Sequence, residues 1–311
     1  MVKKEEFYYD SSDNKTKIQG IRWIPENQTI IGILQIAHGM VEFIDRYDEF
    51  ARVLAENGFL VVGNDHLGHG NSVLNKTDWG FFSEQNGAGV LLEDMHLLLN
   101  ITKELYPRIP YFLLGHSMGS FLTRQFITVY GNELKGAIIV GTGCQPYIFV
   151  KAGQLLSVII AKYKGWRYRS GLIDYLALGS NNKRFEPGRT PKDWLSRDKK
   201  IVDDYLADDR NNFVFTLNAY KNMFDFILYL YDKRNLVQMP KALPLLIISG
   251  KDDPVGDFGK GVLKVYESFN TLGMEAVSLK LYEGYRHEII NETGREIVYN
   301  DIIQWLYKYI K

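Results

Sequence analysis

The stretch "YFLLGHSMGSFLTRQF", residues 111–126, runs from an apolar segment through two glycines into an amphipathic segment. Ser117 stands between Gly115 and Gly119, in the pattern G-x-S-x-G. This pattern occurs by chance in many chains, and a small residue between glycines is also common where a strand turns tightly into a helix. The role of Ser117 therefore depends on the rest of the chain.

Short apolar runs alternate with helix-length segments on both sides of this stretch. The apolar runs are residues 30–39, 58–66, 111–117, 134–143, 243–253 and 276–284. The helical segments are residues 44–57, 88–106, 118–131, 258–272 and 295–310. Strands that are apolar throughout are typical of a parallel sheet covered on both faces, so the pattern predicts an α/β fold with a mostly parallel central sheet. Residues 17–25, "KIQGIRWIP", alternate more and predict the beginning of an antiparallel edge.

This alternation stops between residues 145 and 235. The segment contains helical spacing and a helix start at Thr190-Pro191, but no apolar run comparable to the predicted strands. We therefore expect a helical insertion over one end of the sheet. The predicted core consists of residues 1–144 and 236–311.

Composition is that of an ordinary folded protein, with 46% hydrophobic and 24% charged residues. Lysine plus arginine and aspartate plus glutamate each total 37, giving a formal net charge of zero. Nucleic-acid binding usually requires a basic excess or a clustered basic face, so no nucleic-acid partner is expected.

The N-terminal "MVKKEEFYYD" lacks an apolar core of signal-peptide length, and no later stretch reaches the roughly 18 uninterrupted apolar residues of a membrane span. The single cysteine, Cys144, cannot form an internal disulfide. These features predict a cytoplasmic protein that does not span a membrane.

Three polar residues follow predicted strands in the order Ser117, Asp253, His287. In an open parallel sheet, ligands gather at the carboxyl ends of the strands. A serine hydroxyl becomes a good nucleophile when a histidine takes its proton and an acid orients that histidine. The set therefore predicts a catalytic triad of Ser117, His287 and Asp253, although the adjacent Asp252 remains an alternative acid.

Such chemistry also needs donors for an oxyanion. The backbone N–H of Met118, just after Ser117, is one candidate, and the N–H of Met40 in the turn "AHGMVE" is the other. The loop "DHLGHGNS" places His66 and His69 near Asp65, but zinc needs three or four ligands and no further Cys/His cluster accompanies them. We expect no metal and no cofactor.

These residues resemble the α/β-hydrolases grouped as monoacylglycerol lipases, lysophospholipases and serine aminopeptidases of the S33 type. The matching stretches are "AHGMVEFIDRYDEFARVLAENGF", "NDHLGHGNS", "LLGHSMGS", "ISGKDDPVG" and "GYRHEIINE". The chain order Ser, Asp, His is also that of the α/β-hydrolase fold. In that family the acid lies two or three residues after the strand glycine, and the resemblance favours Asp253, just before Pro254, over Asp252. The resemblance further implies that residues 145–235 form a lid lining an acyl pocket.

The resulting expectation is a serine hydrolase that cleaves a small-molecule acyl ester, of the monoacylglycerol or lysophospholipid type, through an acyl-enzyme. A serine aminopeptidase of the same fold is one alternative, and acyl transfer to another alcohol uses the same machinery. A non-catalytic ligand-binding relative is the alternative from a different class. A partly exposed apolar lid would also allow transient contact with lipid surfaces.

Overall fold

An eight-stranded sheet forms the centre of the computed structural model, which describes residues 1–310. The strand order across the sheet is β1-β2-β4-β3-β5-β6-β7-β8. The strands are β1 (Val2–Asp10), β2 (Lys17–Pro25), β3 (Gly32–Ala37), β4 (Phe59–Asn64), β5 (Tyr111–His116), β6 (Gly136–Val140), β7 (Leu245–Gly250) and β8 (Val277–Tyr282). From β4 to β8 all neighbours are parallel, which confirms the predicted fold class.

The two N-terminal strands are antiparallel to their neighbours. Residues 17–25 form the antiparallel strand β2, as predicted, but β2 is not at the edge because β1 lies outside it. In residues 2–10 a run of four charged residues (3–6) precedes three aromatic residues (7–9), and most of these side chains are exposed or half-buried. Such a charged, exposed strand is suited to an edge that must not pair with other chains. Phe7 lies opposite Gly20, whose missing side chain leaves room for the ring.

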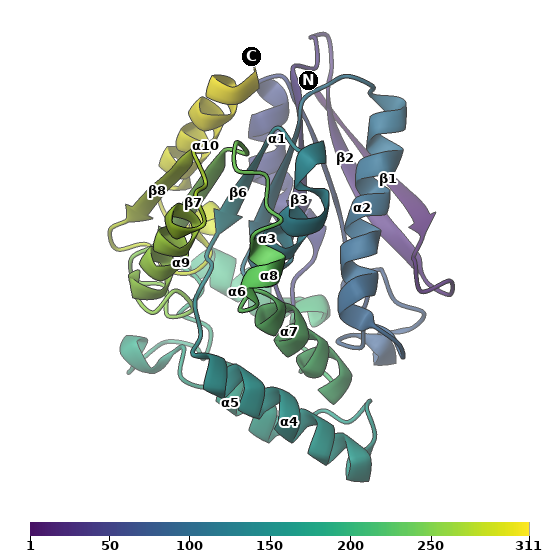
Figure 1. Cartoon of the computed structure of the whole chain (residues 1–311), viewed down its shortest axis with the longest axis vertical. Coiled ribbons are helices and arrows are strands. Elements are labelled where there is room, and N and C mark those ends of the chain that lie inside the picture. The colour runs from purple at the N-terminus through teal and green to yellow at the C-terminus, as the bar shows by residue number, and fades with distance from the viewer. Residues whose placement is uncertain (311) are drawn as a thin grey trace.

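Helices cover both faces of the sheet. On one face lie α2 (Gly87–Leu105), α3 (Met118–Tyr130) and α9 (Lys260–Thr271), and on the other lie α1 (Asp48–Glu56) and α10 (Arg295–Ile310). Each face has its own apolar core, because β3 to β7 alternate their fully buried side chains between the two helical layers. The two termini lie at the same end of the molecule (Figure 1).

Residues 145–235 contain helices and, within this described segment, no strand. The helices are α4 (Tyr147–Lys164), α5 (Gly171–Leu178), α6 (Lys199–Ala207), α7 (Leu217–Tyr229) and α8 (Lys233–Leu236). Figure 1 shows α4 and α5 at the end of the molecule opposite both termini. We call residues 145–235 the cap.

Helix α7 joins the cap to the core. The Asn218 side-chain oxygen accepts from the Phe82 N–H at 3.1 Å, and that of Asn222 accepts from the Ala88 N–H at 3.0 Å. On its other side α7 packs closely against α4, since a Cβ added to Gly153 would lie 2.8 Å from the Phe224 ring. Helix α4 is therefore held above the sheet through α7.

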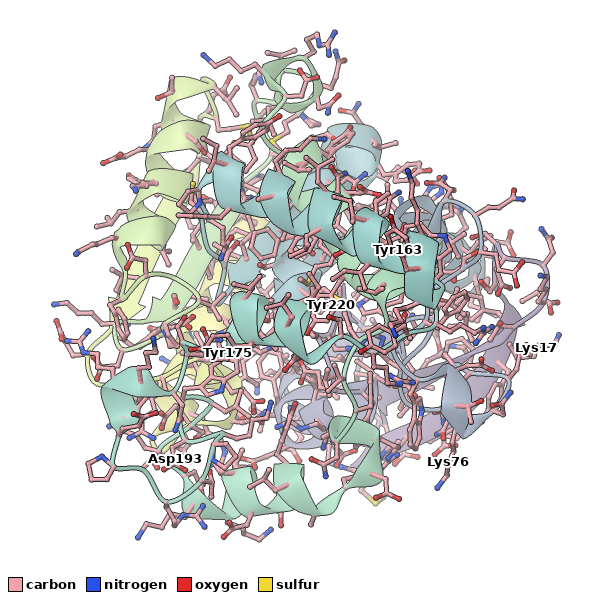
Figure 2. The ribbon with its side chains drawn as sticks, turned by 90° about the horizontal axis from the view of Figure 1, so that it is seen from below. Lys17, Lys76, Tyr163, Tyr175, Asp193 and Tyr220 are labelled. Carbon is pink, nitrogen blue, oxygen red and sulfur yellow. The ribbon has the colours of Figure 1, made fainter. Side chains whose placement is uncertain are left out.

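The outer surface of α4 and α5 is rich in apolar side chains. Figure 2 looks at this end of the molecule and labels Tyr163 of α4 and Tyr175 of α5. Other large exposed apolar side chains on these two helices are Tyr147, Ile148, Phe149, Leu155, Ile159, Leu172 and Leu176. Across the described residues, no helix is both long enough and apolar enough to cross a membrane.

Candidate active site

Ser117 occupies a sharp turn between β5 and α3. Its backbone adopts φ 51° and ψ −116°, a conformation that costs a non-glycine residue free energy and is typical of functional sites. Both flanking glycines are sterically required, because a Cβ at Gly119 would overlap the Ala37 carbonyl and one at Gly115 would overlap the Gly119 carbonyl. The G-x-S-x-G pattern thus reflects close packing of this turn against β3.

His287 is oriented by Asp253. The imidazole Nδ1 lies 2.9 Å from Asp253 Oδ1, and both side chains are buried. The same carboxylate accepts from the Val255 N–H at 2.8 Å and from the Ser249 hydroxyl at 3.2 Å. These bonds hold the acid in place. Because Asp253 bonds to Nδ1 of His287, the other ring nitrogen, Nε2, is the one that can accept a proton from a neighbouring group.

Asp252 is placed differently from Asp253. Its backbone N–H donates to the Tyr285 carbonyl at 2.9 Å, and its half-buried side chain makes no hydrogen bond or ion pair within residues 1–310. In the tight turn after β7, the second aspartate and not the first therefore bonds to His287.

Met40 and Met118 line the same cavity as Ser117 and His287. Within residues 1–310, neither methionine N–H has a hydrogen-bond acceptor, so both donors are available. The turn that carries Met40 is strained, since Val41 has a φ of 55°, which is unfavourable for a β-branched residue. The Tyr205 hydroxyl donates to the Val41 carbonyl at 2.9 Å and so ties this turn to the cap.

A buried ionic network is hydrogen-bonded to the turn that carries Met40. Glu42 accepts from the Gly39 N–H, from the Tyr47 hydroxyl at 3.0 Å and from Arg46 at 2.7 Å. Arg46 also forms a bidentate pair with Glu288, at 2.9 and 2.6 Å. Since Glu288 directly follows His287, the network links the turn after β3 to the loop that carries the histidine.

His116 also belongs to this network, and its Nδ1 lies 3.0 Å from Glu42 Oε1. Burial alone would lower the pKa of His116, but the hydrogen bond and charge of Glu42 raise it above its ordinary value. Burial would likewise raise the pKa of Glu42, yet His116 and Arg46 hold it well below its usual range. Glu42 is therefore an ionised, fully paired carboxylate.

Three further histidines pack beneath the Met40 turn. His38 accepts from the His66 N–H at 2.9 Å, and the His38 ring lies 4.3 Å from that of His66 and 5.1 Å from that of His69. Burial lowers the pKa of His66 to about 4 and that of His69 to about 3, so both are neutral near pH 7. In the described part of the chain, no three His, Cys, Asp or Glu side chains converge in the manner of metal ligands.

A cavity of about 670 Å³ lies between the sheet and the cap. Ser117, His287, Met40 and Met118 line it on the sheet side. The cap and α3 contribute a mainly apolar lining that includes Phe121, Phe149, Val150, Leu156, Leu176, Met223, Phe224 and Ile227. Its size and lining are those of a site for a largely apolar small molecule with a few polar groups.

Of the residues predicted for the site, Ser117, His287, Met40 and Met118 line this cavity, and Asp253 lies behind it, hydrogen-bonded to His287. The structure also adds Glu42, Arg46 and Glu288, which were not predicted as site residues. The spacing of Glu42 and Arg46 is compatible with a local ion pair, but Glu288 is 242 residues from Arg46 in the sequence. No local pattern indicates that contact.

Comparison with known proteins gives a consistent result. Residues 28–294 match the family model described as serine aminopeptidase, S33. A monoacylglycerol lipase of Mycolicibacterium smegmatis is 27% identical over 290 residues, which cover 93% of this chain and 92% of that protein. A monoglyceride lipase of Rattus norvegicus is 28% identical over 273 residues, covering 87% of this chain and 79% of the relative.

Among solved structures, a highly thermostable carboxyl esterase from Bacillus coagulans, crystallised in complex with glycerol, has a TM-score of 0.91 to this chain. The two are 28% identical, and the match covers 100% of both chains. The similarity therefore includes the cap as well as the sheet.

Proposed function

The chain belongs to the serine aminopeptidase S33 family and is a carboxylic ester hydrolase, and we propose that it cleaves acyl esters of the monoacylglycerol or lysophospholipid type. The observation that carries this proposal is the cavity, which combines an apolar cap lining with Ser117 and His287 at its base. An acyl chain suits the apolar part, and its ester carbonyl then lies at the serine.

In the proposed mechanism, Ser117 Oγ attacks the ester carbonyl carbon while His287 Nε2 takes the hydroxyl proton. The N–H groups of Met40 and Met118 stabilise the oxyanion of the tetrahedral intermediate. The bond to the alcohol then breaks, and His287 gives its proton to that alcohol. Water, activated by His287, attacks the acyl-enzyme and releases the fatty acid, while Asp253 orients the imidazole and stabilises its charged form.

We also propose that the cap acts as a lid. It forms the apolar side of the cavity, and the Tyr205–Val41 hydrogen bond couples it to the turn that carries Met40. The exposed apolar side chains of α4 and α5 are suited to transient contact with a lipid surface, from which a long-chain acyl ester would enter.

An aminopeptidase activity receives less support from the charges of the cavity. Such a substrate carries an ammonium group, which requires an uncommitted buried carboxylate. Glu42 and Glu288 line the cavity, but Arg46 pairs with both. Asp257 is exposed, so solvent screens its charge.

The experiment that tests the proposal uses Ser117→Ala with Ser157→Ala as its control. Ser157 lies in α4 outside the cavity lining, and its hydroxyl donates to the Gly153 carbonyl. Ser117→Ala should lower kcat on 1-decanoylglycerol by at least about 10⁴-fold and abolish labelling by a fluorophosphonate. The control should change activity by less than about twofold.

Substantial turnover by Ser117→Ala would refute the nucleophile. A wild-type preference for an aminoacyl anilide over 1-decanoylglycerol would refute the substrate class.

A further inference from the structure

Lys192 lies in the cavity and takes no part in the proposed chemistry. Its backbone belongs to a turn closed by Asp193, whose carboxylate accepts from the N–H of Arg189 and from the N–H and hydroxyl of Thr190. The Lys192 N–H donates to the Thr190 hydroxyl at 3.2 Å. This turn fixes the point from which the lysine side chain enters the cavity.

The position of Lys192 is at the polar end of the cavity. The next residues run beside the histidine loop, where the Glu288 N–H donates to the Leu195 carbonyl at 2.8 Å and the Trp194 ring lies 5.0 Å from that of His287. Lys192 Nζ lies 5.8 Å from the centre of the Tyr205 ring, whose hydroxyl holds the Met40 turn. Most of the apolar lining lies on α3, α4 and α7, and in the scheme proposed below an acyl chain bound there leaves the alcohol part of the ester toward Lys192.

The ammonium group of Lys192 has no committed partner. Within residues 1–310 its Nζ forms no ion pair or hydrogen bond. The carboxylates whose charges act on it are those of Asp174 and Glu288. Asp174 accepts from the Tyr220 hydroxyl, and Glu288 is held by Arg46. Burial lowers the pKa of Lys192, and the two carboxylates only partly oppose this shift.

Lys192 is therefore a half-buried cation of the cavity that is left without a partner. Arg46 pairs with Glu42 and Glu288, and Asp253 bonds to His287, whereas Lys192 presents three donors to the cavity with no acceptor of its own. When an acyl substrate displaces water, an ammonium group without an acceptor becomes costly. An anionic oxygen on the substrate satisfies it best, because charge-assisted hydrogen bonds are stronger than neutral ones.

We propose that Lys192 binds a phosphate group on the alcohol part of the ester, so that the chain favours lysophospholipid-type glycerol phosphates over neutral monoacylglycerols. This inference rests on the proposed function, since it assigns the alcohol side of that same site. Lys192 is a substrate-binding residue in this scheme and transfers no proton.

The test compares 1-decanoylglycerol 3-phosphate with 1-decanoylglycerol, both below the concentrations at which they aggregate. The measured quantity is the ratio of kcat/KM for the phosphate ester to that for the neutral ester. Lys192→Met should lower this ratio about 10- to 100-fold, which corresponds to the loss of one charged hydrogen bond. Lys192→Arg should retain most of the ratio, and Lys199→Met, an exposed cap lysine outside the cavity lining, should leave it unchanged.

A second measurement does not depend on turnover. Ser117→Ala should bind 1-decanoylglycerol 3-phosphate in calorimetry, and adding Lys192→Met should raise its Kd at least about tenfold. Equal loss on both esters, no change in the ratio, or an unchanged Kd would each overturn the role of Lys192. Failure of the wild type to hydrolyse either ester would refute the proposed function, while the Kd comparison would still decide the role of the lysine.

Discussion

Two consecutive aspartates, Asp252 and Asp253, differ completely in their surroundings. Asp253 is fully buried, and both of its carboxylate oxygens accept hydrogen bonds, one of them from His287 at 2.9 Å. Asp252 is half-buried, and its side chain makes no hydrogen bond to the histidine. In a turn one residue changes the direction of a side chain, so adjacent identical residues receive different roles.

We predict that Asp253→Asn lowers kcat/KM for 1-decanoylglycerol by about 10⁴-fold, because an amide cannot hold the required imidazole tautomer or stabilise its charge. Asp252→Asn is the matched control and should change kcat/KM by less than about threefold. Steady-state kinetics on purified variants, with thermal unfolding monitored to show that both fold, measure the difference. The reverse order of effects would assign the acid to Asp252.

Helices α4 and α5 present an unusually apolar outer surface. Ile148 is 73% exposed and Ile159 is 53% exposed, and neither lines the cavity. Exposed apolar side chains are common singly, but a contiguous group on two neighbouring helices indicates a contact surface. The proposed contact is with a lipid surface.

We predict that Ile148→Ser combined with Ile159→Ser weakens partitioning into phosphatidylcholine vesicles at least about tenfold. Each substitution removes apolar side-chain area that would be buried in lipid. Ile297→Ser, an exposed isoleucine on α10, is the control and should leave partitioning unchanged. Cosedimentation with vesicles measures both. Unaltered partitioning of the double variant would exclude this surface as the contact.

For the molecule as a whole, buried histidines connect folding stability to pH. Burial first, and then the nearby His66, lower the pKa of His69 from 6.5 to about 3. The unfolded chain therefore binds a proton at His69 once the pH falls below about 6.5, whereas the folded chain does not until about pH 3. The stability contributed by the neutral ring is present above pH 6.5 and is lost as the pH falls.

We predict that His69→Phe reduces the acid sensitivity of folding. Between pH 7 and pH 5 the wild type should lose about 2 kcal/mol of unfolding free energy through this histidine, and the variant should not. Phenylalanine suits the site because Phe82, Phe213 and Phe215 surround the ring at 5.4 to 5.9 Å. Urea unfolding at the two pH values measures the change.

Contributions common to both proteins cancel in that comparison. Asp65 and Asp94, whose pKa values burial raises to about 6, bind protons in the folded state first and so oppose the acid loss equally in each. An identical pH dependence in wild type and variant would show that His69 is not the titrating group.

Much of the architecture could be predicted because its signals are local. Runs such as residues 245–250 are buried at every position, so their apolar character alone indicates a central strand. Strand β1 was not predicted, because its run of four charged residues is also typical of a solvated segment and only its pairing with β2 makes it a strand. The antiparallel direction of β2 was predicted, but its place inside the sheet was not.

The amino-acid sequence alone specifies the alternation of strands and helices, the helical character of residues 145–235, and the glycine-flanked turn at Ser117, because periodicity and steric limits act between neighbouring residues. Three-dimensional packing selects Asp253 rather than Asp252 as the partner of His287, joins Glu42 to Glu288 through Arg46, and brings Lys192 into the cavity without a partner. Those outcomes depend on contacts between residues far apart in the chain. Which charges are neutralised and which remain available to a substrate is therefore settled by packing, since burial strengthens every pairing and penalises every charge left alone.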